Sequence, residues 1–247
     1  MRTKRTISFL LTSLVLIGAG CGQSASVATN GTPTEKPSTT TSESCGNPYF
    51  GFKPGLTIAY SVTPFQQTAG DSDYTTNIVG VSGNTVTART EMAGGITSNV
   101  KVNCLDHSVI STDGQDFKMT VVSSSGTFMP SDVKAGSTWS NAQTVQLEST
   151  SDAAVAAGMG VFTITTTEQS RAVADESVTI KAGTYKAVKV EVTRTSTNEF
   201  TGSAANKTPP STSTSVEWWV KGIGMVKSIT TGEGSTSTIE AKSITGA

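Results

Sequence analysis

Apolar and polar residues alternate along most of the chain beyond position 55. In the segment LTIAYSVT, one face of an extended strand would carry Leu56, Ile58, Tyr60 and Val62. Such a period of two residues indicates half-buried β-strands. The pattern recurs over residues 78–92, which we interpret as a hairpin with Ser82-Gly83-Asn84 at its turn.

Further alternating segments follow, with gaps of turn length between them. They are 99–105, 116–122, 145–149, 161–170, 177–196, 215–229 and 235–244. About ten to twelve short strands connected in this way predict an all-β protein, built as a curved antiparallel sheet or half-barrel. Only SDAAVAAGMG, residues 151–160, has helical character, so we expect at most one short helix.

A Lys-Pro-Gly or Lys-Ala-Gly motif precedes three of the predicted strands, beginning at Lys53, Lys134 and Lys181. We interpret the three motifs as one kind of turn, in which glycine occupies the bend and the next apolar or aromatic residue enters the sheet.

The N-terminus has a different pattern. A basic start with Arg2, Lys4 and Arg5 precedes an apolar stretch, residues 7–17, that is too short to span a bilayer. The stretch ends in GAGC, and this arrangement resembles a bacterial lipoprotein signal. The resemblance implies that residues 1–20 are removed and that Cys21 is diacylated, which would anchor an exported protein to the cell membrane or outer membrane. Ordinary secretion and an uncleaved anchor are the alternatives.

Residues 22–44 have no apolar periodicity and consist mainly of Ser, Thr and Pro. Such a composition predicts a disordered tether, because the segment has nothing to bury. As a flexible coil it would reach about 25 Å on average. We therefore expect a lipidated cysteine and tether over residues 21–44 and a single β domain over residues 45–247.

Composition and cysteine content narrow the class of protein. Charged residues make up 15% of the chain and the net charge is −1, which argues against a nucleic-acid partner. Of the three cysteines, Cys45 and Cys104 remain once Cys21 is assigned to lipidation. An even pair in an oxidising compartment predicts a structural disulfide, and the absence of CxxC spacing disfavours a metal or redox role.

Two motifs resemble a group of uncharacterised bacterial lipoproteins. KAGTYKAVKV (residues 181–190) is similar to the Ala-Gly-Thr-Tyr strand of that group, and EWWVKGIGMVK (residues 217–227) to its Trp-Tyr-x-x-Gly-Val-Gly-Leu-Val-Lys motif. The opening NPYFGFKPGLTIAYSV resembles the group's Tyr-Phe-Pro…Gly…Trp-x-Tyr start, with Gly51 in place of the proline and Ile58 in place of the tryptophan. The resemblance implies a curved sheet like the half-barrels of Lol-type lipoprotein carriers, and it supplies no catalytic residues.

The adjacent tryptophans of EWWVKGIG point to opposite faces of a strand. Trp218 is in phase with Val216 and Val220, so we expect it in the core. Trp219 has three possible environments: it is covered by a turn or loop, half-exposed at an edge, or in the lining of a ligand cavity. We interpret the following Gly222-Ile223-Gly224 as a bulge or tight turn.

Motifs for catalysis and metal binding are weak. His107 is the only histidine, which excludes a metal site made of several histidines and any Ser-His-Asp triad without it. Ser131 and Lys134 fit the S-x-x-K pattern, but they lie in a turn that enters a strand rather than at the start of a helix. The sequence therefore predicts no catalytic residue, no metal site and no cofactor.

Three functional hypotheses remain. The first is a non-catalytic envelope lipoprotein that binds or carries an apolar ligand, such as a lipid, a glycolipid or a cell-wall fragment. Its cavity would be lined by Trp219, Tyr185, Tyr60 and Trp139, chosen as aromatic residues on predicted strands. The second is a structural module that recruits an unidentified protein partner through a sheet edge. The third is a hydrolase with two facing carboxylates, one of them with a raised pKa.

Overall fold

The computed structural model describes residues 45–63, 73–93, 95–104, 109–114, 117–149, 160–201, 206–232 and 234–247. The predicted signal peptide, the lipidation site Cys21 and the predicted tether lie outside the described residues. So do residues 151–159 of the predicted short helix, and His107.

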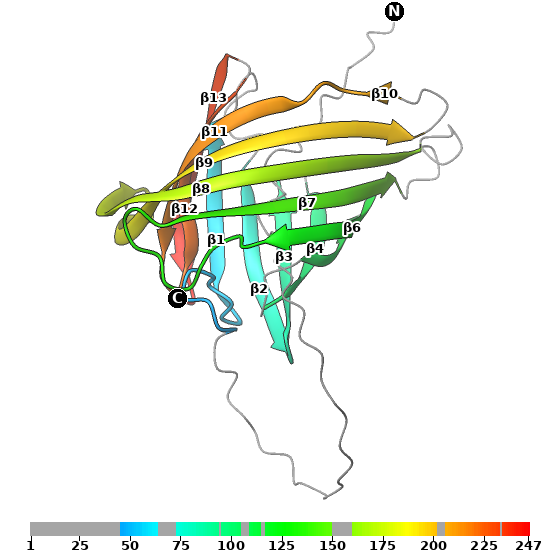
Figure 1. The fold of residues 1–247 in the computed structure, drawn as a ribbon. Helices are drawn as coiled ribbons and strands as arrows, with labels where there is room; N and C mark the ends of the chain where they lie inside the picture. The colour runs from blue at the N-terminus through cyan, green and yellow to red at the C-terminus, as the bar shows by residue number, and fades with distance from the viewer. Residues whose placement is uncertain are drawn as a thin grey trace, which may run out of the picture.

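The described residues form thirteen β-strands and no helix (Figure 1). The strands are β1 (Thr57–Thr63), β2 (Tyr74–Ser82), β3 (Thr85–Met92), β4 (Thr97–Asn103), β5 (Val109–Gly114), β6 (Phe117–Gly126), β7 (Thr138–Ser149), β8 (Val161–Ile180), β9 (Gly183–Thr201), β10 (Asn206–Lys207), β11 (Ser211–Val220), β12 (Gly224–Gly232) and β13 (Ser235–Thr245). Within this part of the chain there is accordingly no helix long and apolar enough to cross a membrane. The prediction of an all-β protein is confirmed.

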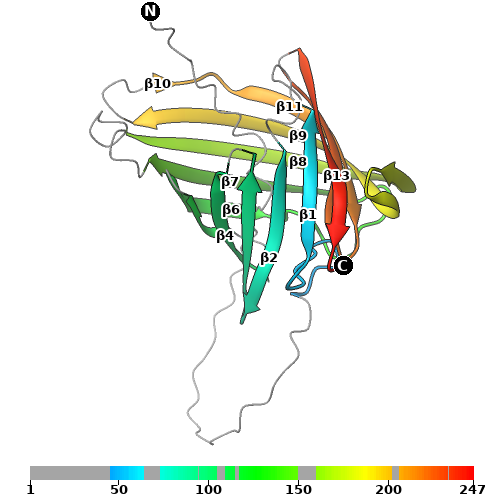
Figure 2. The ribbon, with the colours of Figure 1, turned by 180° about the vertical axis from the view of Figure 1, so that it is seen from behind.

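All thirteen strands belong to one antiparallel sheet, and its pairings form a circuit. Strands β1 to β9 pair in chain order, β9 pairs with β11, and β11, β12 and β13 lead back to β1. Only the two-residue β10 lies outside this circuit, on β9. The sheet therefore curves further than the half-barrel we expected: Figures 1 and 2 show the long β8 and β9 across one end, with β1 to β4 forming the wall beneath them.

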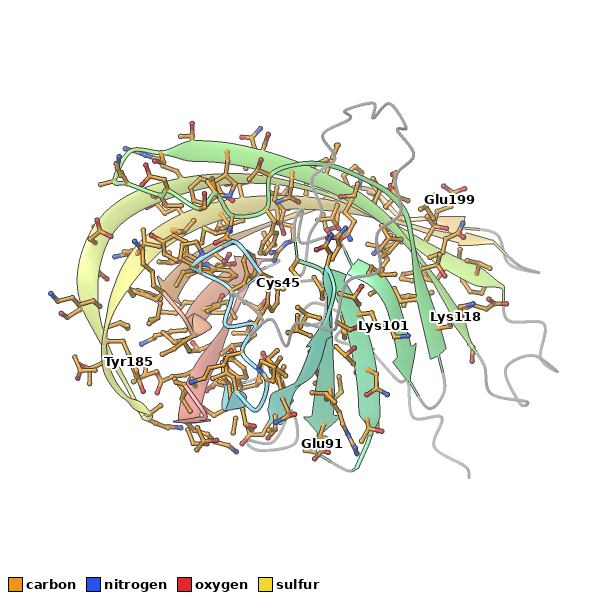
Figure 3. The ribbon with its side chains drawn as sticks, turned by 90° about the horizontal axis from the view of Figure 1, so that it is seen from below. Cys45, Glu91, Lys101, Lys118, Tyr185 and Glu199 are labelled. Atoms are coloured by element: carbon orange, nitrogen blue, oxygen red, sulfur yellow. A yellow bond between two sulfur atoms is a disulfide. The ribbon has the colours of Figure 1, made fainter. Side chains whose placement is uncertain are left out.

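Alternation assigns one face of each strand to the interior of the sheet. The four β1-region residues predicted to share a face, Leu56, Ile58, Tyr60 and Val62, are all buried. On β4 and just after it, Val100, Val102 and Cys104 are buried as predicted. Figure 3 shows the sheet curving around such side chains, with Cys45 inside the curve. We call this side of the sheet the inner face.

Turn chemistry explains two of the three Lys-x-Gly motifs. The amide of Leu56 donates to the carbonyl of Lys53 at 3.0 Å, and the amide of Ser137 donates to that of Lys134 at 2.9 Å. In both turns the third residue is a glycine with positive φ, 86° at Gly55 and 92° at Gly136. This is the geometry of a type II turn, which requires φ above zero at its third position. The third motif instead forms the tip of the β8–β9 hairpin.

The segment before β1 is fixed inside the sheet. Cys45 and Cys104 form a disulfide, as predicted, and it ties this segment to the end of β4. The side chain of Asn47 donates to the carbonyl of Met129. The amide of Gly222 donates to the carbonyl of Pro48 at 2.7 Å, which joins the segment to the β11–β12 hairpin. The residues between Cys45 and Leu56 are therefore held against three distant parts of the chain.

Candidate functional site

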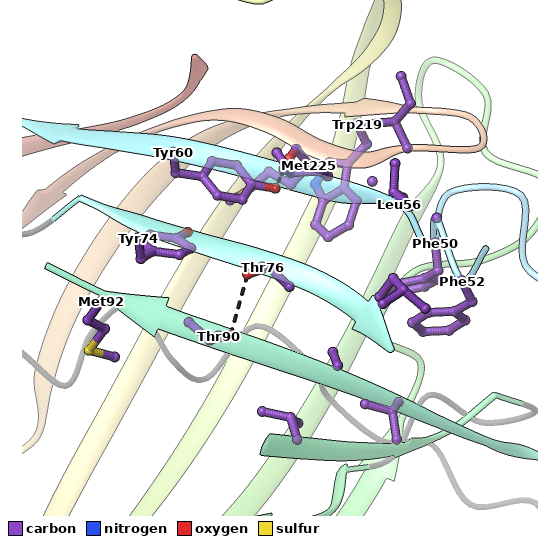
Figure 4. A pocket seen from close by; sticks show the side chains of 18 residues that line it. Phe50, Phe52, Leu56, Tyr60, Tyr74, Thr76, Thr90, Met92, Trp219 and Met225 are labelled. Atoms are coloured by element: carbon purple, nitrogen blue, oxygen red, sulfur yellow. Dashed lines mark hydrogen bonds between the residues drawn. The ribbon is translucent and has the colours of Figure 1, made fainter. Parts of the chain in front are cut away.

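An apolar cavity of about 190 Å³ lies on the inner face, between the wall of β1 to β4 and the turn of β11 and β12 (Figure 4). Its lining consists of Phe50, Gly51, Phe52, Leu56, Ile58, Tyr60, Tyr74, Thr76, Ile78, Ala88, Thr90, Met92, Val100, Val102, Trp219, Ile223, Gly224 and Met225. None of these side chains carries a charge.

The wall formed by β1 to β4 arises because every second residue of a strand points to the same face. Alternate residues of β1, β2, β3 and β4 point into the cavity, and the antiparallel register sets them side by side. One such row crosses from Ile58 through Thr76 to Thr90. Because apolar residues fill most of these positions, the wall presents a mainly apolar surface to the cavity.

The opposite wall comes from two segments that are far apart in sequence. Phe50 stacks on Phe52 with 5.3 Å between ring centroids, and its ring meets the edge of Trp219 at 5.8 Å. Gly51 lies so close to the β11–β12 turn that a Cβ atom there would overlap the carbonyl oxygen of Ile223. The absence of a side chain at position 51 therefore allows the segment to reach this turn.

Two tyrosines of the cavity, Tyr60 and Tyr74, pack against each other. Tyr60 donates to the carbonyl of Met225 at 2.8 Å, and its ring stacks on Tyr74 at 4.8 Å between centroids. Burial raises the pKa of both phenols, that of Tyr60 well above its usual range, because the charged phenolate would lose its hydration. The cavity thus disfavours negative charge.

The two adjacent tryptophans lie on opposite faces of β11. Trp219 is 4% exposed, contacts Phe50 and Phe128, and lines the cavity. Of the three environments considered for it, two therefore apply together: loop segments cover it and it lines a cavity. Trp218 is also buried, as expected, but away from the cavity.

On that other face, Trp218 donates from Nε1 to Glu176 at 2.7 Å. The ammonium groups of Lys189 and Lys227 lie 5.6 and 5.5 Å from its ring centroid. The spacing of Val216, Trp218 and Val220 predicted that Trp218 is in the core, and it is buried, but its face of β11 is not the one that borders the cavity. The residues of β11 on the inner face are Ser215, Glu217 and Trp219. The carboxylate of Glu217 can be buried there because Ser215 and Trp219 donate hydrogen bonds to it.

A buried polar cluster adjoins Trp219 on the inner face, and sequence reasoning missed it. Glu217 is 4% exposed and accepts hydrogen bonds from Ser215 Oγ and Trp219 Nε1, both at 3.0 Å. Glu168 pairs with Arg194 and accepts from Asn141 Nδ2 at 2.9 Å. The alternation of polar with apolar residues in β8 and β11 fits either face, so no pattern in the sequence places these side chains inside.

Several interactions act on the carboxyl group of Glu217 in opposite directions. Burial raises the pKa of Glu217; the guanidinium of Arg194 lowers it, Glu168 raises it, and the hydrogen bonds from Trp219 and Ser215 lower it. Both carboxylates face a second cavity of only about 10 Å³, shared with Trp139 and Trp219. Within the described residues, no group of three potential ligands could hold a metal ion.

The other two predicted lining residues lie elsewhere. Tyr185 is half-buried in the β8–β9 hairpin, where its hydroxyl donates to the carbonyl of Ala182 at 3.1 Å. Figure 3 shows it at the rim of the sheet. Trp139 borders only the small second cavity, and its Nε1 donates to the carbonyl of Phe128 at 2.6 Å. The larger cavity therefore unites Trp219 and Tyr60, together with residues such as Phe50 and Thr90 that the sequence did not single out.

Solved structures with a similar course of the chain come from three bacteria. One, from Bacteroides fragilis, is described as an exported protein with a YmcC-like fold; it is 12% identical, with a TM-score of 0.48, over 78% of this chain and 96% of that one. A protein from Parabacteroides distasonis described as a lipoprotein is 10% identical, with a TM-score of 0.45, over 80% and 98%. The hypothetical lipoprotein YmcC of Escherichia coli is 10% identical, with a TM-score of 0.38, over 76% and 87%.

No curated protein matches the chain in sequence. The profile of one protein family does match, over residues 53–232. This range includes both motifs, at 181–190 and 217–227, on which the resemblance to bacterial lipoproteins was based. The chain belongs to the DUF3108-like family.

Proposed function

We propose that this protein binds a small apolar molecule, or the apolar end of a larger one, in the cavity between Trp219 and the wall of β1 to β4. The observation that carries the proposal is the cavity itself, about 190 Å³ in volume and lined by uncharged, mostly apolar side chains. An apolar lining favours apolar guests, as an engineered apolar cavity of about 150 Å³ in another protein takes up benzene.

The size of the cavity limits the ligand. Pockets for drug-sized molecules measure about 300–1,000 Å³. By proportion with benzene, a cavity of about 190 Å³ accepts on the order of six to eight carbon atoms. We therefore propose recognition of a short chain or a single ring, rather than enclosure of a whole lipid.

We further propose that binding takes place at the cell envelope. The support is the lipoprotein-like N-terminus, in which Cys21 follows an apolar stretch and small residues. Two acyl chains on Cys21 would give a stable anchor, since each buried methylene contributes about 0.8 kcal/mol. The serine- and threonine-rich residues 22–44 would then separate the β domain from the membrane surface.

The two alternative functions have less support. Recruitment of a partner through a sheet edge requires an unpaired strand, but twelve of the thirteen described strands pair on both sides. A hydrolase could use Glu168 and Glu217. The space between them, about 10 Å³, is the size of one water molecule, so a substrate has no access there in this conformation.

Bromobenzene tests the proposal, because its bromine quenches tryptophan fluorescence only at contact. The experiment uses the full chain with Cys21→Ser, so that neither acyl chains nor detergent compete for the cavity. Six ring carbons at about 0.8 kcal/mol each give about 5 kcal/mol, hence half-saturation near about 0.2 mM. We expect saturable quenching that Trp218→Phe retains and Trp219→Phe abolishes. Quenching that never saturates, or that depends on Trp218, would refute the proposal.

A further inference from the structure

A row of hydroxyl groups crosses the inner face beside the cavity. Thr76 and Thr90 line the cavity, and their Oγ1 atoms lie 3.4 Å apart across β2 and β3 (Figure 4). Ser98 on β4 is the register partner of Thr90. Because strand residues two apart share a face, Ser98 points to the same side as Val100 and Val102, which also line the cavity.

The Ser98 hydroxyl is the unusual member of this row. Ser98 is 2% exposed, and its Oγ has no hydrogen-bond partner in the part of the chain that the structure describes. Buried hydroxyls are normally satisfied, because an unpaired one has lost its bonds to water without replacement. Because Ser98 is not among the lining residues, a ligand in the cavity meets the row at Thr76 and Thr90 instead, whose side chains do line it.

The uncharged lining of the cavity restricts which polar group a ligand there could carry. No lysine, arginine, aspartate or glutamate is among the lining residues, so neither an anion nor a cation finds a countercharge there. Burial raises the pKa of Tyr60 and Tyr74 beside the hydroxyl row, which is the expected effect of a site that disfavours negative charge. A carboxylate or phosphate would lose its hydration on entering the cavity and would find no opposite charge among the lining residues to compensate.

We propose that Thr76 and Thr90 form an uncharged hydrogen-bonding subsite, and that the ligand is a neutral amphiphile: a short apolar group bearing a hydroxyl, ester or amide. This inference rests on the proposed function, since it assigns the ligand class of the same cavity. The apolar part lies against Trp219 and Tyr60, and the neutral polar group bonds to the hydroxyl row.

Four eight-carbon probes separate this inference from simple apolar binding: octane, 1-octanol, octanoate and octylammonium. Each is measured by its displacement of bromobenzene from the full chain with Cys21→Ser, as recovery of tryptophan fluorescence at pH 7. We expect octane and 1-octanol to displace the quencher, and 1-octanol to bind at least about tenfold more tightly than either ion, because a buried charge without a partner is costly.

The variant Thr90→Val, which removes a lining hydroxyl and keeps the shape of the side chain, tests the subsite directly. It should weaken 1-octanol about threefold to tenfold, the value of one neutral hydrogen bond, and leave octane within about twofold. Ser177→Ala, at an exposed serine of β8, is the control and should change neither. Equal binding of 1-octanol and octanoate, or an unchanged affinity for 1-octanol in Thr90→Val, would overturn the subsite while leaving apolar binding intact. If octane also fails to displace bromobenzene, the proposed function itself is wrong.

Discussion

Removal of the Cys45–Cys104 disulfide should destabilise the protein by an amount that its loop length sets. The two cysteines are 59 residues apart. In the chain-entropy model, a closed loop of about 60 residues reduces the entropy of the unfolded chain by about 14 cal/mol/K, or about 4 kcal/mol at 25 °C. The total stability of a domain is about 5–15 kcal/mol, so this is a large fraction of it.

The perturbation is the double variant Cys45→Ala/Cys104→Ala, compared with the disulfide-bonded protein, both in the Cys21→Ser background. Urea unfolding followed by tryptophan fluorescence gives the free energy of unfolding of each. We expect a loss of about 4 kcal/mol, together with a steeper dependence on urea, because the unlinked chain unfolds to a more expanded state. The disulfide also holds the segment with Phe50 and Phe52 against the cavity, so bromobenzene should bind more weakly.

Two outcomes would refute this reasoning. A loss below about 1 kcal/mol would mean that the cross-link does little to restrict the unfolded chain, contrary to the chain-entropy model. Unchanged bromobenzene binding in a folded double variant would mean that the segment keeps its place without the disulfide, through the hydrogen bonds of Asn47 and Pro48 alone.

Two further predictions concern single side chains. Gly51→Ala should cost about 1–3 kcal/mol of unfolding free energy, because the new methyl group meets the backbone of Ile223. Gly80→Ala, where no atom lies within 4 Å of the added carbon, should cost less than about 1 kcal/mol, and equal losses in urea unfolding would contradict the close approach. Since burial raises the pKa of Glu217, its contribution to stability is fully present below the ordinary glutamate pKa and is lost as the pH rises through the raised value. Unfolding measured from pH 4 to pH 8 should show that Glu217→Gln gains stability relative to the parent as the pH rises; a difference that is independent of pH, or of opposite sign, would contradict the burial of an ionisable group.

Local patterns in the sequence predicted the strands and several turns. The spacing of Leu56, Ile58, Tyr60 and Val62 fixes one face of β1, because a strand has a period of two and water favours one side. Glycine at the bend of 53–56 predicted a turn, and the structure has one there, with positive φ at Gly55. The disulfide followed from counting cysteines in a chain that we expected to be exported.

Two features could not be predicted in this way: the closure of the sheet, and which residues of β11 point to the inner face. Pairing of β1 with β13 joins the two ends of the domain, and no local pattern specifies which distant strands meet. For β11, alternation separates two faces but does not say which is inside. Val216 and Trp218 made their face look apolar, whereas the structure turns Glu217 inward, where Ser215 and Trp219 satisfy its carboxylate.

The cavity was predicted only in part, for a related reason. Trp219 and Tyr60 were chosen as aromatic residues on strands, and both line it. Phe50 and Phe52 precede the first strand and have no periodic neighbours, so their position depends on the disulfide and on the fit of Gly51 against the β11–β12 turn. Such contacts between distant segments appear only once the chain is folded.

The most direct test of the central claim is a crystal structure of the full chain with Cys21→Ser, soaked in bromobenzene and measured at the bromine absorption edge. We expect an anomalous bromine peak inside the cavity, within van der Waals contact of Trp219 and the wall of β1 to β4. A saturated crystal with no bromine there, or with bromine only beside Trp218 on the other face, would contradict it.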